Sequence, residues 1–131
     1  MSDIVNPRRA YLEHVAIFVR DIRFHIRFFK EVLGMTMREV EGTPEEPRQY
    51  WTLGGMQFIA MPGFEGPEGR LAHLGVMCED LDAALAAARK FEVEPMPQGP
   101  NWLRLPDGLA IEFIQARNDA VRRALAIDPR S

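Results

Sequence analysis

The chain has 131 residues, of which 47% are hydrophobic and 27% charged, with a formal net charge of -3. This size and composition are typical of one globular folding unit that buries a sizeable apolar core. The slightly acidic balance provides no broad positive field, so we expect no binding to nucleic acid. No run approaches the roughly 18 apolar residues that cross a bilayer, and the first residues begin no signal peptide. The sequence therefore predicts a cytoplasmic protein without a membrane partner.

The first half predicts one strand, one helix and three further strands. Residues 12–19 form a β-branched and aromatic run of strand length. Asp21 can cap a helix whose apolar residues recur on one face and which ends at Gly34. Three shorter strand-like segments follow, at 35–41, 48–53 and 56–61.

The second half repeats this order. Residues 71–78 predict a strand, Asp80 can cap the next helix, and a turn is expected at 106–108, where proline presets φ and glycine accepts a positive φ. Three further strand-like segments lie at 93–96, 102–105 and 109–115, and 118–126 predicts a short terminal helix. Cys78 is the only cysteine, which excludes an intrachain disulfide and thiolate-rich zinc sites. Its apolar neighbours predict a buried strand thiol.

A histidine stands seven residues before each helix cap: His14 before Asp21 and His73 before Asp80. The two halves are therefore copies of one unit, and neither is expected to bury its sheet alone. We predict an α+β chain that forms a single domain of two βαβββ modules. The modules span about 11–61 and 71–116, with a linker at 62–70 and a C-terminal tail at 117–131.

Three polar residues stand among apolar or small neighbours on their predicted strand faces: His14, His73 and Glu112. A buried carboxylate is costly unless it is protonated, ion-paired or bound to a metal. Two neutral imidazoles and one carboxylate suit Fe(II), Mn(II), Ni(II) or Zn(II) and leave coordination positions open. The alternatives are histidines hydrogen-bonded within the core and a pairing of Glu112 with Arg104 across the hairpin.

The segments 14–21, 28–35 and 105–113 resemble the vicinal oxygen chelate superfamily, and the likeness runs from about residue 11 to 116. This superfamily includes lactoylglutathione lyase, methylmalonyl-CoA epimerase, extradiol dioxygenases, fosfomycin-modifying enzymes and bleomycin-binding proteins. The resemblance implies that the two modules form a curved mixed-sheet cleft around one divalent metal ion. It places the ligands of the first and fifth strands on His14 and His73 and that of the last strand on Glu112, which is also the expected catalytic residue.

A fourth ligand of the family comes from the last strand of the first module. Gln57 and Ile59 both fit that place, and strand alternation leaves the choice open because they share a face. Glutamine departs from the carboxylate that would serve best as a base in proton transfer next to a carbonyl. This departure weakens the prediction of a standard isomerase. The three-ligand version, with two histidines and one glutamate, resembles that of the extradiol dioxygenases and the fosfomycin-modifying enzymes.

The resemblance leaves three functions to distinguish. The first is an isomerase or lyase of the glyoxalase type that acts on a small substrate with vicinal oxygens; the second is an extradiol-type Fe(II) dioxygenase. The third is a metal-free protein that binds or sequesters a small molecule. We predict substrate contacts from Trp51, Arg48, Ile59 and Trp102, with ordinary core packing as the alternative for the aromatic residues. A homodimer is also expected from the resemblance.

Overall fold

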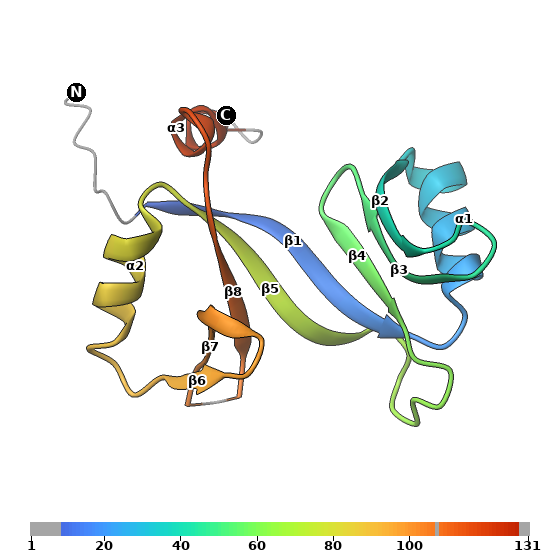
Figure 1. Cartoon of the computed structure of the whole chain (residues 1–131). Coiled ribbons are helices and arrows are strands. Elements are labelled where there is room, and N and C mark those ends of the chain that lie inside the picture. The colour runs from blue at the N-terminus through green and yellow to red at the C-terminus, as the bar shows by residue number, and fades with distance from the viewer. Residues whose placement is uncertain (1–8, 107, 129–131) are drawn as a thin grey trace. The chain divides into compact units, whose positions relative to one another are not determined.

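The computed structural model describes residues 9–106 and 108–128, and its elements repeat one βαβββ order twice (Figure 1). The first module contains β1 (Ala10–Val19), α1 (Ile22–Leu33), β2 (Met37–Gly42), β3 (Pro47–Thr52) and β4 (Met56–Ala60). The second contains β5 (Arg70–Cys78), α2 (Leu81–Ala88), β6 (Glu94–Met96), β7 (Gly99–Arg104) and β8 (Ala110–Gln115). A short helix, α3 (Ala120–Leu125), follows. The predicted succession of strands and helices is thus confirmed, with boundaries shifted by one or two residues at most ends.

The strands form one mixed sheet in the order β2-β3-β4-β1-β5-β8-β7-β6. Within each module the first and last strands are parallel, β1 with β4 and β5 with β8, and the remaining pairs are antiparallel. The order begins at β2 and ends at β6, so the sheet is open. The α+β class and the mixed sheet of two βαβββ modules are therefore confirmed.

Residue contacts divide the chain into two compact units. One is His14–His73, and the other combines the described parts of Met1–Glu13 and Leu74–Ser131. The division falls inside β1 and β5, so each of these long strands belongs partly to each unit. The organisation as a single domain with a linker at 62–70 stays a prediction.

In the unit His14–His73, α1 packs on one face of the strands β3 and β4 (Figure 1). Asp21 caps the helix by accepting a hydrogen bond from the Phe24 amide at 3.1 Å, and Gly34 ends it in the left-handed conformation with φ 69°. The buried core consists of Val19, Ile22, Tyr50 and Phe58. Because side chains alternate along a strand, the residues between these core positions lie on the sheet face opposite α1.

In the other unit, Asp80 caps α2 by accepting from the Ala83 amide at 3.1 Å, and Leu85 of the helix is buried. Cys78 is buried as predicted, and burial raises the pKa of its thiol. Gly108 has φ 99°, as the predicted turn requires, whereas Asp107 of the same turn lies outside the described residues. Residues 129–131 of the predicted tail lie outside them as well.

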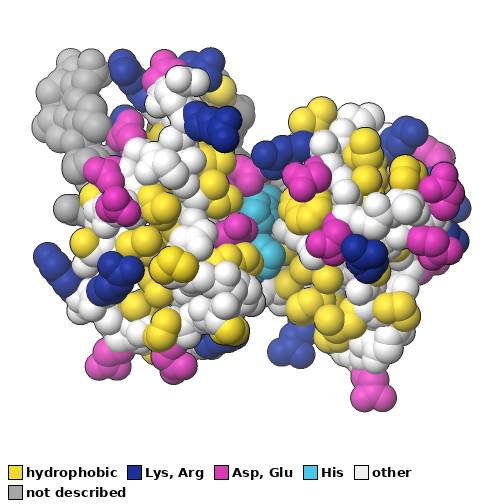
Figure 2. All heavy atoms as spheres, viewed as in Figure 1, with side chains coloured by type: hydrophobic (Ala, Val, Ile, Leu, Met, Phe, Trp, Pro, Cys, Tyr) yellow, Lys and Arg dark blue, Asp and Glu magenta, His cyan; other side chains and the backbone are white. Residues whose placement is uncertain are grey.

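The surface carries both signs of charge. On the face shown in Figure 2, acidic and basic side chains are interspersed with hydrophobic ones, so no extended basic patch appears on that face. Among the described residues, no helix is both long and apolar enough to span a membrane.

Candidate metal centre

Two buried histidines face each other through the same ring nitrogen. His14 comes from β1 and His73 from β5, and their side chains are only 6% and 8% exposed. Their Nε2 atoms lie 3.1 Å apart, and the rings meet edge to face. Two nitrogens at this distance cannot both carry a proton, so at least one imidazole is neutral and offers a lone pair.

The electrostatics of His73 favour its neutral form. Burial away from water, and then the nearby His14, lower the pKa of His73 from 6.5 to about 4. At neutral pH the His73 ring is therefore uncharged. A metal ion binds the neutral imidazole, so no proton has to leave His73 before coordination at that pH.

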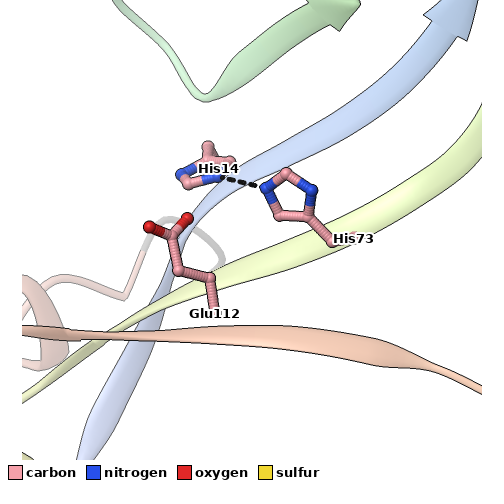
Figure 3. Close-up of side chains that lie close together, drawn as sticks. All are labelled: His14, His73 and Glu112. Atoms are coloured by element: carbon pink, nitrogen blue, oxygen red, sulfur yellow. Dashed lines mark hydrogen bonds between the residues drawn. The ribbon is translucent and has the colours of Figure 1, made fainter. Parts of the chain in front are cut away.

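Glu112 reaches the same place through the pairing of β8 with β5. Glu112 lies opposite Gly75, which is two residues after His73 on the same face of β5. Ligand atoms of His14, His73 and Glu112 all lie within 4.8 Å of one another, and the three side chains point toward a common centre (Figure 3). The structure thus brings together the three residues that the sequence singled out.

Strand register distinguishes the two candidates for a fourth ligand. Gln57 on β4 lies opposite Ala16, which is two residues after His14, just as Glu112 lies opposite the residue two after His73. Gln57 is therefore the register equivalent of Glu112 in the first module. Ile59 lies opposite Phe18, a further two residues along β1 and so about 6 to 7 Å farther from His14 along the strand.

The environment of Gln57 is unusual for a buried amide. Its side chain is 3% exposed, and its Nε2 donates to Gln49 Oε1 at 2.5 Å. Its Oε1 is buried and has no hydrogen-bond partner in the part of the chain that the structure describes. Such a group costs about 1 to 3 kcal/mol unless something else satisfies it.

This donor set fits a divalent metal ion. Ligand atoms that lie 2.0–2.2 Å from one shared ion are about 3 to 4 Å apart, so the observed spacing requires only small side-chain adjustments. Two imidazoles and a carboxylate suit Fe(II), Mn(II), Ni(II) or Zn(II). An ion within reach of Gln57 Oε1 would also satisfy that buried oxygen.

Comparison with known proteins agrees with this geometry. The family model of the Glyoxalase/Bleomycin resistance protein/Dioxygenase superfamily matches residues 11–113. The chain belongs to this superfamily. The curated relative "Uncharacterized protein YwbC" of Bacillus subtilis (strain 168) is 28% identical to this glyoxalase-superfamily chain, and the alignment covers 79% of the chain and 96% of YwbC.

Solved structures share the fold at low sequence identity. Methylmalonyl-CoA epimerase from Mycobacterium tuberculosis is 20% identical, with a TM-score of 0.58 over 85% of this chain and 91% of the epimerase. The 2,3-dioxygenase LapB from Pseudomonas sp. KL28 is 19% identical, with a TM-score of 0.59 over 80% of this chain and 42% of the dioxygenase. These likenesses establish the superfamily fold, which two different reactions share.

Tryptophans stand beside two of the candidate ligands. Trp51 lies opposite Gln57 in the β3–β4 pair, and Trp102 lies opposite Glu112 in the β7–β8 pair. Both are partly buried and lie on the faces that carry the candidate ligands. Ile59 shares the face of Gln57. These three positions agree with the predicted substrate contacts, which stay predictions.

Arg48 lies differently. It alternates with Gln49 on β3, so its Cβ points to the face that carries α1, and its side chain is 70% exposed. Its Nε lies 3.6 Å from Glu41 Oε1, a surface ion pair. A role for Arg48 in substrate binding remains a prediction, and among the described contacts none joins it directly to a candidate ligand.

Sequence reasoning missed Gln49 and Glu41. Gln49 contacts Gln57 directly, and its Nε2 donates to Glu41 Oε1 at 3.3 Å. The signal in the sequence was weak: Gln49 stands two residues before Trp51, and therefore on the same strand face. Only the strand register reveals that both glutamines face one another.

Proposed function

We propose that this chain is a divalent-metal-dependent enzyme of the glyoxalase type that acts on a small substrate with vicinal oxygens. The observation that carries the proposal is the convergence of His14, His73 and Glu112. The buried amide oxygen of Gln57, at the register-equivalent position of the first module, has no described partner and adds support. A protein that needed no ion would have little reason to bury two histidines beside a carboxylate. We also propose Gln57 as the fourth ligand.

Each residue has a separate role in this proposal. When bound, the ion supplies a Lewis acid toward adjacent substrate oxygens. His14 and His73 would hold it as neutral ligands, so that only Glu112 adds negative charge. Because a carboxylate has two oxygens, Glu112 can bind through one and exchange a proton with a carbon next to a carbonyl through the other. Trp51 and Trp102 would exclude water beside these groups.

Metal binding is the first test. Protein purified without a histidine tag should contain a divalent metal or acquire one on calorimetric titration with Mn(II), Ni(II), Zn(II) or anaerobic Fe(II). The variant Glu112→Gln should bind much more weakly, whereas Glu92→Gln, an exposed carboxylate outside the candidate site, should match the parent. Absence of any binding by the parent would refute the proposed enzyme and favour a metal-free binding protein.

Proton transfer next to a carbonyl is the reaction that we propose first. Its support is the likeness to methylmalonyl-CoA epimerase together with the two-oxygen base Glu112. NMR in deuterium oxide measures it directly: the metal-loaded protein should exchange the carbon-bound proton of an acidic 2-methyl-substituted thioester or of an α-hydroxy ketone. No exchange above that of Glu112→Gln with any such compound would contradict this choice of reaction.

An extradiol-type Fe(II) dioxygenase is the second candidate. It is supported by the likeness to the dioxygenase LapB and by a ligand set of two histidines and one glutamate. After anaerobic loading with Fe(II), oxygen uptake should then follow the addition of a catechol. Absence of uptake with all catechols would eliminate this candidate without affecting the metal site.

Two broader expectations belong to the same proposal. We place the protein in the cytoplasm, with a small molecule rather than a macromolecule as its substrate. We further propose a homodimer, as expected from the resemblance to its superfamily. Sedimentation velocity at micromolar concentration tests the dimer, and a single species at the mass of the 14.9 kDa chain would contradict it.

A further inference from the structure

Three polar side chains form a chain of hydrogen bonds that ends at the candidate metal ligand Gln57. Gln57 Nε2 donates to Gln49 Oε1 at 2.5 Å, and Gln49 Nε2 donates to Glu41 Oε1 at 3.3 Å. Gln49 and Glu41 are direct cross-strand partners of the β2–β3 pair. The three residues therefore lie on one sheet face, from the β2 edge inward to β4.

The carboxylate gives this hydrogen-bond chain one direction. An ionised carboxylate accepts hydrogen bonds and donates none, so Gln49 must turn its NH₂ group toward Glu41. The carbonyl oxygen of Gln49 then faces Gln57, so Gln57 must donate a hydrogen bond to it from its own NH₂ group. The remaining group of Gln57 is Oε1, and this is the buried oxygen without a described partner.

The reverse arrangement is electrostatically unfavourable. If Gln57 alone were flipped, two amide oxygens would face each other at the 2.5 Å contact. If both glutamines were flipped, the oxygen of Gln49 would face the carboxylate of Glu41. Either state replaces a hydrogen bond by repulsion between acceptors, in a place where water cannot relieve Gln57 because its side chain is 3% exposed.

We infer that Gln49 is a positioning residue which, anchored by Glu41, keeps the carbonyl oxygen of Gln57 directed at the metal ion. This inference rests on the proposed function. It adds an explanation of how the side-chain amide of Gln57 is held with its oxygen, rather than its NH₂ group, toward the ion. A carboxylate presents an oxygen whichever way it rotates, whereas an amide presents an oxygen in only one of its two orientations. Partners outside the ligand set commonly fix ligand orientation in this way.

Calorimetric titration with Mn(II) or Co(II) tests the inference, together with the visible spectrum of the Co(II)-loaded protein. Gln49→Met keeps the length of the side chain but removes both hydrogen bonds. Its metal affinity should fall about tenfold, the lower end of the range for such partners, and the Co(II) spectrum should change with the loss of one oxygen ligand. Thermal unfolding of each metal-free variant checks that the fold is retained.

Two further variants distinguish positioning from a general structural role. In the background Gln57→Met, which has no oxygen to orient, adding Gln49→Met should cause no further loss of affinity. The double variant Glu41→Gln with Gln49→Glu keeps the total charge and exchanges the two side chains. Residue 41 then donates to residue 49, and the carboxylate at residue 49 still accepts a hydrogen bond from Gln57. This double variant should recover the parent affinity within about twofold and the parent spectrum.

The outcomes separate the inference from the proposed function. A parent protein that binds no metal overturns both. A parent that binds metal, with Gln49→Met unchanged in affinity and spectrum, overturns the inference alone. The same holds if Gln49→Met causes an equal loss in the parent and in the Gln57→Met background, because the effects are then independent of the Gln57 oxygen.

Discussion

The two modules place different side chains at one equivalent position. Gln57 of the first module pairs with Ala16, two residues after His14, and Glu112 of the second pairs with Gly75, two residues after His73. Each also lies opposite a tryptophan in the neighbouring antiparallel strand. The backbone arrangement is the same, but one side chain is a neutral amide and the other a carboxylate. The repeat thus places the two candidate ligands at equivalent positions, and the residue type at each position determines its charge.

This difference sets the charge of the candidate site. In the proposed ligand set of two neutral histidines, a neutral amide and Glu112, the carboxylate would be the only anionic ligand, so a bound divalent ion would retain a net charge of +1. Such a centre attracts anionic oxygens of a substrate more strongly than one neutralised by two carboxylates would. The amide, however, needs Gln49 and Glu41 to direct its oxygen.

The largest expected effect is the removal of the single charge. Glu112→Gln makes the two modules alike and leaves no anionic ligand. We expect its divalent metal affinity to fall on the order of a thousandfold, about 4 kcal/mol, which exceeds the 10- to 100-fold typical of partners outside the ligand set. Titration calorimetry with Mn(II) measures the loss, and a decrease below tenfold would remove Glu112 from the ligand set.

The metal-free histidine pair should make stability depend on pH. The pKa of His73 is about 4 in the folded protein and 6.5 in the unfolded chain, so the unfolded chain binds more protons between these values. The free energy of unfolding should therefore decrease as the pH falls from about 6.5 to about 4, by up to about 3 kcal/mol.

Urea denaturation of the chelator-treated protein at several pH values measures this dependence. His73→Gln should flatten it, because the titrating group is gone. His25→Gln, a histidine on α1 away from the candidate ligands, should retain it. Equal pH profiles for His73→Gln and the parent would contradict the assignment to His73.

Most of the fold was predictable because its signals are local. Asp21 and Asp80 mark helix starts, and the β-branched runs predict strands whatever they pair with. The seven-residue spacing from histidine to helix cap occurs in both halves, and it predicted the two modules. The same pattern singled out His14 and His73.

The unpredicted part depends on which residues pair across strands. Alternation gives the face of Gln57 and Ile59 but not their distance from His14, which the β1–β4 register determines. Hairpin lengths differ between the modules, so sequence offset alone could not align Gln57 with Glu112. The role of Gln49 was hidden for the same reason.

A smaller effect is expected when the first module is given the ligand of the second. Gln57→Glu adds a second carboxylate but loses the Nε2 donor to Gln49, a hydrogen bond worth about 1 kcal/mol. The added attraction to a divalent ion should exceed that loss, so we expect Mn(II) affinity to rise about tenfold, or about 1.4 kcal/mol. Calorimetry that finds an unchanged or lower affinity would indicate that residue 57 is not a ligand.

The smallest expected effect concerns the helices, where the two modules should behave alike. Asp21 and Asp80 each accept one backbone hydrogen bond at 3.1 Å at the start of α1 and α2. Although α1 has 12 residues and α2 has 8, a cap acts only on the first turn, so helix length should not matter. Asp21→Ala and Asp80→Ala should each lower the free energy of unfolding by about 1 kcal/mol and leave metal affinity unchanged. Chemical denaturation measures both losses, and a difference of more than about 1 kcal/mol between them would show that the equivalence of the modules does not extend to their helix caps.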